Sequence, residues 1–237
     1  MKREIIQTSD GSSTIYIKDL DEHYHSKHGA IQEAYHVFLK SGFFPFLKNN
    51  KIEELSILEI GFGTGLNAFI TFIEAENLEL KVKYDGVEAY PVSMEEVKLL
   101  NYVEELKVLD KQSIFLQMHE SEWETYQFIS ENFQLKKRKQ FFDEIENITT
   151  FNLIYFDAFG ARVQPELWEV SIFQKMYNAL KANGVLVTYA AKGSVRRAMQ
   201  EVGFEVERLP GPPGKREMLR AVKKGYEFSS ITLNTCN

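Results

Sequence analysis

The chain has 237 residues, 44% of them apolar, which suits one large folded domain or one domain with a modest insertion. Its formal net charge of −6 argues against a broad nucleic-acid-binding surface, which is usually basic, but it allows a local basic patch. The single cysteine, Cys236, excludes an internal disulfide framework, and the lack of a long apolar run or leader predicts a cytoplasmic protein without a membrane segment.

The N-terminal region is predicted to contain one strand and one helix. The strand, at 12–17, is rich in β-branched residues and follows a turn signal. The helix, at 31–40, is expected to end at Gly42 and Pro45, because glycine favours a helix end and proline interrupts a helix.

Beyond about residue 50, short apolar strands alternate with helices. The seven predicted strands lie at 55–60, 82–88, 133–137, 151–156, 185–189, 204–208 and 217–222. The predicted helices lie at 66–75, 93–100, 165–180 and 194–201. This alternation predicts a doubly wound, Rossmann-like α/β domain whose mostly parallel seven-stranded sheet is covered on both faces. We therefore divide the chain into an N-terminal extension at 1–50, this domain at 51–222 and a C-terminal tail at 223–237.

The most informative segment is a glycine-rich turn between the first of these strands and its helix. Its sequence is Glu59-Ile60-Gly61-Phe62-Gly63-Thr64-Gly65. Glycines allow a tight turn and a close approach of a ligand to the backbone, and open α/β sheets bind ligands at such turns. A dinucleotide fingerprint requires glycine at position 66, which is Leu66, so the spacing argues against a Rossmann dehydrogenase.

Two carboxylates follow later strands of the predicted sheet. Glu88 ends the second strand, where a carboxylate can accept hydrogen bonds from both hydroxyls of a ribose. Asp157 follows the strand at 151–156 and therefore lies beside the same crevice. If the substrate is an amine, an aspartate can hold its ammonium and help to relay the proton. From residue type alone, capping of the next loop explains Asp157 equally well.

Several motifs, taken in order, resemble one family of enzymes. The turn at 59–65 resembles motif I of the class I S-adenosylmethionine-dependent methyltransferases. With it, further segments resemble the tRNA wobble-uridine methyltransferases of the MnmC amino-terminal-domain type, also found as stand-alone MnmD enzymes. These segments are Glu88-Ala89-Tyr90-Pro91, Tyr155-Phe156-Asp157-Ala158-Phe159, Ser194-Val195-Arg196-Arg197, Gly203-Phe204, Lys215-Arg216-Glu217-Met218-Leu219, and Asp21-Glu22-His23-Tyr24-His25-Ser26 with Glu33. The resemblance runs from about residue 10 to 222.

The resemblance implies a class I methyltransferase fold and an established reaction. The donor would be S-adenosyl-L-methionine, and the acceptor the aminomethyl nitrogen of 5-aminomethyl-2-thiouridine at the wobble position of tRNA, giving 5-methylaminomethyl-2-thiouridine. Bifunctional relatives carry an additional FAD-dependent oxidase domain. The sequence shows no second glycine-rich fingerprint, so we expect methyl transfer without the oxidase activity.

The same resemblance implies the site residues. Asp157 would lie by the acceptor amine, and Tyr24, Ser26 and Glu33 would help to close the catalytic site. The implied cofactor-binding residues are Glu59, Gly61, Phe62, Gly63, Gly65, Glu88, Gln140 and Asp157. The family's acid near the adenine amino group is missing here, and either Gln140 or Asp143 is expected to accept that hydrogen bond.

Clusters of polar and aromatic residues add further predictions. The spacing of His23, His25 and His28 invites a metal site, but methyl transfer to an amine needs no metal, and we expect a lid segment without one. The residues expected to contact tRNA phosphates are Arg196, Arg197, Lys215 and Arg216. The basic run at 136–139 suits a solvated face equally well. Phe159 is favoured over Trp123 and Trp168 for stacking on a flipped base.

Two other functions stay open on the sequence. A methyltransferase acting on a small-molecule or protein amine is favoured by the isoelectric point of about 5.5. A nonenzymatic module that binds adenosylmethionine or a nucleotide is disfavoured by the joint presence of Glu59, Glu88 and Asp157.

Overall fold

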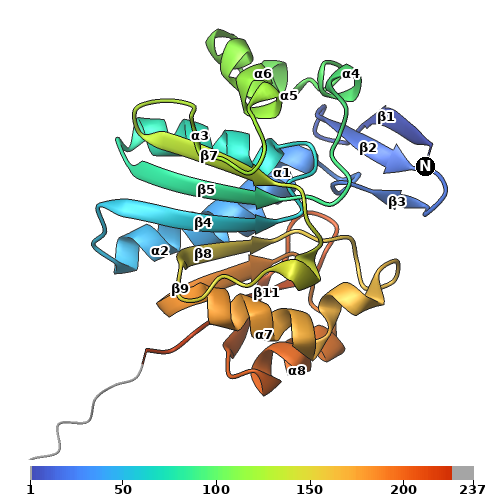
Figure 1. Ribbon diagram of the computed structural model, residues 1–237. Helices are drawn as coiled ribbons and strands as arrows, with labels where there is room; N and C mark the ends of the chain where they lie inside the picture. The colour runs from blue at the N-terminus through green and yellow to red at the C-terminus, as the bar shows by residue number, and fades with distance from the viewer. Residues whose placement is uncertain (1, 226–237) are drawn as a thin grey trace, which may run out of the picture.

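A mixed eight-stranded sheet forms the centre of the computed structural model, which describes residues 2–225 (Figure 1). Across the sheet, the strands are β10 (Glu205–Pro210), β11 (Glu217–Val222), β9 (Leu180–Thr188), β8 (Phe151–Phe156), β4 (Glu54–Ile60), β5 (Lys81–Val87), β7 (Phe133–Arg138) and β6 (Gln127–Phe128). The four central pairs, from β9 to β7, are parallel, and the outer pairs are antiparallel. The predicted Rossmann-like α/β fold is confirmed, but the sheet has eight strands instead of the predicted seven. The additional strand is β6, which was not predicted because its two residues carry no recognisable strand pattern.

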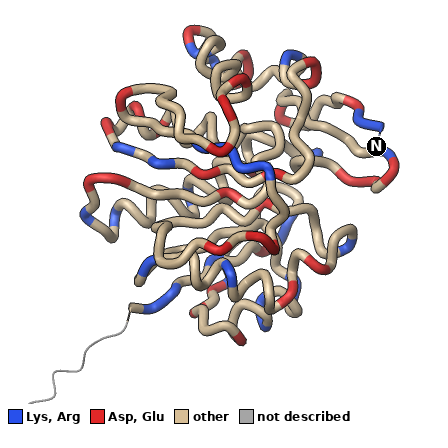
Figure 2. Tube along the Cα trace, in the orientation of Figure 1, with Lys and Arg blue, Asp and Glu red and all other residues tan. Residues whose placement is uncertain are grey.

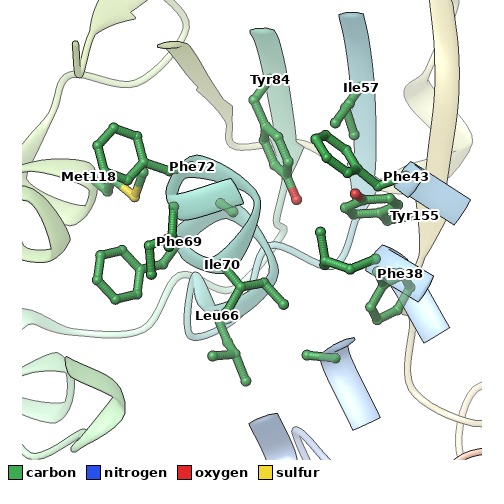
Figure 3. Packing of buried hydrophobic residues seen from close by; sticks show 14 of the residues in the cluster. Phe38, Phe43, Ile57, Leu66, Phe69, Ile70, Phe72, Tyr84, Met118 and Tyr155 are labelled. Atoms are coloured by element: carbon green, nitrogen blue, oxygen red, sulfur yellow. The ribbon is translucent and has the colours of Figure 1, made fainter. Parts of the chain in front are cut away.

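Helices cover both faces of the sheet and enclose two apolar clusters. One face carries α3 (Leu66–Asn77) and the N-terminal helical segment, and the other carries α7 (Val170–Ala179) and α8 (Gly193–Glu201) (Figure 1). Neighbouring strand residues alternate between the faces, as Ile57 and Tyr155 belong to the first cluster whereas Leu58 and Ile154 belong to the second. Figure 3 shows aromatic side chains from both the sheet and α3 in the first cluster.

The N-terminal helical segment runs further than predicted. It comprises α1 (Ala30–Ala34), a π-helical stretch (Tyr35–Phe43) and α2 (Phe44–Asn49), so the predicted end at Gly42 and Pro45 is wrong. A Cβ atom on Gly42 would lie 2.9 Å from Val187, so the glycine allows close packing on β9. Pro45 occupies the first turn of α2, where its missing N–H costs little.

A separate three-stranded antiparallel sheet precedes this segment. It contains β1 (Arg3–Gln7), β2 (Ser13–Ile17) and β3 (Glu22–His23), and only β2 was predicted. The Arg3 guanidinium donates to the backbone oxygens of Tyr90 and Pro91, at 2.9 and 3.4 Å, in the loop after β5. This small sheet is thereby tied to the edge where the central strands end.

Two other predicted helices are shorter than expected. Ser93 forms the predicted cap of α4 (Met94–Val97), which ends three residues before residue 100, and α5 (Tyr102–Glu105) and α6 (Gln112–Glu120) follow. The predicted helix at 165–180 is divided into a 3-10 turn (Pro165–Trp168) and α7, because the backbone at Glu169 is extended. Asn183 has a φ of 62° within an irregular part of β9.

The described residues bear on two further predictions. Within residues 2–225, no helix has both the length and the apolar character that crossing a membrane requires. Cys236 and most of the predicted tail lie outside the described residues.

Candidate active site

A cavity of about 520 Å³ lies at the edge of the sheet where β4, β5 and β8 end. The strand order reverses here, because the chain passes from β4 to β5 on one side and later reaches β8 on the other. Open α/β sheets bind their ligands at such switch points. The volume of the cavity is typical of sites for cofactors and other small molecules.

The turn after β4 brings bare backbone to the wall of this cavity. The φ angles of Gly61, Gly63 and Gly65 are 90°, 50° and 70°, a region that favours glycine. A Cβ atom on Gly61 would lie 2.7 Å from the carbonyl oxygen of Asp157, so the turn and the end of β8 meet closely. Phe62, which also lines the cavity, is buried against β5.

Glu88 lines the cavity directly after β5 and is held by backbone amides. The N–H of Gly63 donates to Oε2 at 3.0 Å, and the N–H of Tyr90 donates to Oε1 at 2.9 Å. Burial raises the pKa of the Glu88 carboxyl, and these amides partly oppose the rise. Each carboxylate oxygen retains a lone pair, so Glu88 can still accept hydrogen bonds from two neighbouring hydroxyls.

Asn67 is a polar residue of the site that the sequence analysis missed. It lies in the first turn of α3 and lines the cavity, and its Nδ2 donates to Glu59 and to Asp157, at 2.8 Å each. Glu59 is completely buried and also accepts a hydrogen bond from Tyr84 at 2.9 Å. Glu59 therefore lies behind Asn67, and burial raises the pKa of its carboxyl well above the ordinary value. The available signal was a lone amide within the apolar first turns of a helix.

Asp157 lies at the end of β8 and lines the cavity. Burial first, and then the nearby Glu33 carboxylate, raise the pKa of Asp157 to about 7, against the opposing effects of Asn67 and Lys215. A carboxyl with such a pKa exchanges protons near neutral pH, as general acid–base catalysis requires.

The segment predicted to close the site lies against it. Tyr24 lines the cavity and packs edge-on against Phe159, with 5.2 Å between the ring centroids. The backbone N–H of Ser26 donates to Glu33 Oε2 at 2.8 Å, which ties this segment to α1. Tyr24 thus reaches the cavity itself, while Ser26 and Glu33 support the segment behind it.

Lys215 is placed differently from its predicted role at a phosphate-binding rim. Its Nζ lies 2.7 Å from Glu33 Oε1 and 3.7 Å from the centroid of the Tyr189 ring. The Tyr189 hydroxyl donates in turn to the backbone oxygen of Ala158 at 2.7 Å, next to Asp157. Lys215 therefore joins the loop between β10 and β11 to the side of the cavity that holds Asp157.

The other predicted phosphate contacts lie at the same edge of the sheet. Arg196 and Arg197 lie in the first two turns of α8, and Arg216 precedes β11. Because β9 is parallel to β8 and β11 is antiparallel to β9, α8 begins and β11 starts at the edge that holds the cavity. Arg197 and Arg216 are exposed, whereas Arg196 is partly buried. Figure 2 shows basic and acidic residues spread over the described part of the trace, with neither sign confined to one region.

The two candidates for an adenine contact are placed unequally. The Gln140 side-chain oxygen accepts a hydrogen bond from Arg138 Nε at 2.9 Å. Asp143, in the 3-10 turn Phe142–Glu144, lines the cavity. The geometry therefore favours Asp143 over Gln140.

The three clustered histidines diverge. His23 stacks on Tyr16, with 4.7 Å between the ring centroids, and His25 packs edge-on against Tyr102. Burial lowers the pKa of His25 to about 4, so this ring is neutral at physiological pH. Within residues 2–225, no group of three His, Cys, Asp or Glu side chains is arranged to hold a metal.

Neither Trp123 nor Trp168 is among the residues that line the cavity. Trp168 is buried and donates through Nε1 to the backbone oxygen of Phe159 at 2.8 Å. Trp123 lies 4.9 Å from Lys137 Nζ, a buried ammonium of the basic run at 136–139 that also donates to the His119 backbone oxygen. Burial lowers the pKa of Lys137 to about 8. Of the three aromatic candidates, Phe159 is the one that lines the cavity.

The cavity wall carries an excess of acidic residues. Six carboxylates line it, and among residues 2–225 no lysine or arginine does. These acids are Glu88, Asp143, Glu144, Asp157, Glu166 and Glu169. Such a wall favours a cationic ligand, because opposite charges attract more strongly where water is partly excluded.

Comparisons with known proteins show similarity to methyltransferases. A family model described as S-adenosyl-L-methionine-dependent methyltransferase matches residues 116–224. The "tRNA 5-methylaminomethyl-2-thiouridine biosynthesis bifunctional protein MnmC" of Actinobacillus pleuropneumoniae is 28% identical over 229 residues, covering 89% of this chain and 34% of that protein. The MnmC of Leptospira borgpetersenii is 27% identical, over 87% of this chain and 33% of its own length. The chain thus spans about a third of these relatives.

Solved structures are also similar to this chain. The crystal structure of MNMC2 from Aquifex aeolicus superposes with a TM-score of 0.74 and 26% identity, over 95% of this chain and 71% of that one. A probable spermidine synthase from Corynebacterium glutamicum, 18% identical with a TM-score of 0.54, covers 97% of this chain and 80% of its own and shares the fold. The chain is therefore similar over most of its length to the methyltransferase part of the MnmC proteins, and its C-terminal half matches the S-adenosyl-L-methionine-dependent methyltransferase model.

Proposed function

We propose that the chain methylates the aminomethyl nitrogen of the modified wobble uridine in tRNA, converting 5-aminomethyl-2-thiouridine to 5-methylaminomethyl-2-thiouridine. The names and coverage of the relatives support this acceptor. The observation that carries the proposal is Asp157, a carboxyl with a pKa near 7 in a cavity lined by acids. The aminomethyl group is a cation at neutral pH and suits such a wall. Its tRNA substrate would place the reaction in the cytoplasm.

Asp157 would prepare the acceptor nitrogen. An ammonium has no free electron pair, so it must lose a proton before the nitrogen can bond to the methyl carbon. The Asp157 carboxylate would hold the ammonium and accept that proton, while Asn67 keeps the carboxylate in place. When bound, S-adenosylmethionine would supply the methyl group from its sulfonium, with the N–C bond forming as the S–C bond breaks and the electron pair staying on the sulfur.

The residues around the cavity fit S-adenosylmethionine. Bare backbone at Gly61, Gly63 and Gly65 allows close approach of its amino-acid part, and Phe62 would pack beside it. Glu88 would bind the ribose hydroxyls, and Asp143 rather than Gln140 would accept from the adenine amino group. In this proposal Glu59 acts indirectly, because it is buried and bonded to Asn67.

Replacing Glu88 with alanine is expected to lower the affinity for S-adenosylhomocysteine by about tenfold to a hundredfold, since two hydrogen bonds to a charged group are lost. Isothermal titration calorimetry measures this change. Glu95→Ala is a matched control, because Glu95 is an exposed glutamate on α4. Equal affinities of Glu88→Ala and wild type would remove Glu88 from the ribose site.

The tRNA surface would lie on the rim formed by the start of α8 and the loop before β11. Arg197 and Arg216 are its exposed members, Arg196 is partly buried, and the Lys215 ammonium forms an ion pair with Glu33. Phosphates bound by such side chains release counterions, which makes the affinity depend on salt.

Reversing the charges at Arg197 and Arg216 to glutamate is expected to weaken tRNA binding and to reduce the slope of log affinity against log salt by roughly one to two. Filter binding at several salt concentrations measures the slope. The double variant Lys51→Glu, Lys81→Glu changes the net charge equally at the opposite edge of the sheet, where β4 and β5 begin, and serves as the control. If both variants behave alike, the rim is not the tRNA surface.

The decisive experiment is a methyl-transfer assay on bulk tRNA from cells that lack this activity. Purified protein and adenosylmethionine are added, and the nucleosides are analysed by mass spectrometry. Formation of 5-methylaminomethyl-2-thiouridine, lost in Asp157→Ala, is the expected result. If adenosylmethionine binds but no tRNA nucleoside is methylated, the acceptor is instead a small-molecule or protein amine.

A further inference from the structure

Asn67 carries a buried polar atom that the protein leaves without a partner. Its side chain is 2% exposed and lies at the wall of the cavity. Its oxygen, Oδ1, accepts no hydrogen bond from any residue in 2–225. Buried polar atoms are almost always hydrogen-bonded, so this oxygen points to a donor that belongs to a bound molecule.

The two acids beside Asn67 determine which way its amide faces. Nδ2 lies 2.8 Å from Glu59 Oε1 and 2.8 Å from Asp157 Oδ2, so each of its two N–H groups has an acceptor. Reversing the amide would place Oδ1 against Glu59 Oε1 and Asp157 Oδ2, which only accept hydrogen bonds when these carboxyls are ionised. Oδ1 is therefore the atom that remains available as an acceptor.

The surrounding charges indicate which donor it accepts from. The wall holds six carboxylates, and among residues 2–225 it holds no lysine or arginine, so it favours a cation. A primary ammonium is a cation with three N–H donors, enough to meet the Asp157 carboxylate and Asn67 Oδ1 together. We propose that Asn67 Oδ1 and Asp157 form a subsite for a primary ammonium group, with Asn67 as a direct ligand contact.

Two molecules of the reaction carry such a group. One is S-adenosylmethionine, through the ammonium of its amino-acid part. The other is the acceptor nucleoside, through its aminomethyl group, and this source alone rests on the proposed function. Both sources present the same chemistry to Asn67, and binding and rate measurements separate them.

The test compares wild type with Asn67→Ala on two related ligands. S-adenosylhomocysteine carries the amino-acid ammonium, and 5′-methylthioadenosine lacks the amino acid altogether. A loss of tenfold or more for the first ligand, with the second changed less than twofold, assigns the subsite to the cofactor. Unchanged affinity for both, with a tenfold higher KM for the tRNA acceptor, assigns it to the aminomethyl group.

Two results would overturn the proposal. Affinities and rates that all stay within twofold of wild type show that Oδ1 has no ligand, and equal losses for both ligands show a collapsed cavity instead. If wild type binds S-adenosylhomocysteine but methylates no tRNA, the proposed function fails, and the two-ligand comparison alone then decides.

Two further variants guard against misfolding. Asn67→Ser keeps a hydroxyl that can donate to one acid but removes Oδ1, and it is used if Asn67→Ala does not fold. Thr71→Val alters the next turn of α3, where the threonine hydroxyl donates to the Asn67 backbone oxygen, and it is expected to leave both affinities unchanged.

Discussion

Replacing Asp157 with asparagine is expected to slow methyl transfer by about a hundredfold to ten-thousandfold. The asparagine retains an oxygen for the Asn67 N–H, but it has no carboxylate to accept a proton from the acceptor ammonium. The rate of the wild-type protein should rise with pH around the Asp157 pKa of about 7, because the Asp157 carboxylate is the active form. The residual rate of Asp157→Asn should lack that rise. Single-turnover rates with saturating adenosylmethionine, measured between pH 5.5 and 8.5, provide the test.

The same substitution is expected to stabilise the protein at high pH. The pKa of the Asp157 carboxyl is about 7 in the folded chain and near 3.8 in the unfolded chain, so the folded chain binds this proton more tightly. The stability that this proton binding contributes is fully present below pH 3.8. That contribution is lost as the pH rises to about 7. At pH 8, Asp157→Asn should melt roughly 3–8 °C higher than wild type, and the difference should shrink toward pH 4.

An exposed carboxylate provides the control for both measurements. Asp110→Asn, whose side chain is 74% exposed, should change neither the rate nor the melting temperature measurably. An Asp157→Asn protein with a near-wild-type rate would show that the acceptor loses its proton by another route.

Replacing Gly61 with alanine is expected to remove cofactor binding and to destabilise the fold. Its φ of 90° costs about 1–3 kcal/mol for a residue with a side chain. The new methyl group would also lie 2.7 Å from the Asp157 carbonyl oxygen, so the turn or the end of β8 must move. Either movement displaces the glycine turn from the cavity. Urea unfolding and calorimetric titration with S-adenosylhomocysteine measure the two effects.

Gly160→Ala is the matched control for this substitution. Gly160 does not have a positive φ, and a Cβ there would meet the Tyr189 hydroxyl at an ordinary 3.6 Å. We expect near-wild-type stability and affinity for this variant. A Gly61→Ala protein that still binds S-adenosylhomocysteine with wild-type affinity would contradict the close fit described for the turn.

Local patterns in the sequence were sufficient to predict the central fold. The strands were recognisable as short apolar runs, and the turn at 59–65 as a glycine-rich break between a strand and a helix. These features depend on residues close together in the chain. Parallel strands also end at one edge of a sheet, so Glu88 and Asp157 were predicted near the turn, where the structure places them.

Irregular elements were predicted less well, because tertiary packing determines them. Gly42 and Pro45 are typical of a helix end, yet the helical segment continues where it packs on β9. The two-residue strand β6 forms only by pairing with β7. Neither outcome follows from local preference.

The sequence by itself therefore determined the fold class, the glycine turn and two of the acids that line the cavity, Glu88 and Asp157. Only the tertiary structure showed that Lys215 contacts Glu33, 182 residues away. It also showed that Asn67 joins Glu59 to Asp157. The physical reason is that backbone conformation follows largely from neighbouring residues, whereas the partner of a charged or amide group depends on which distant segments the fold brings together.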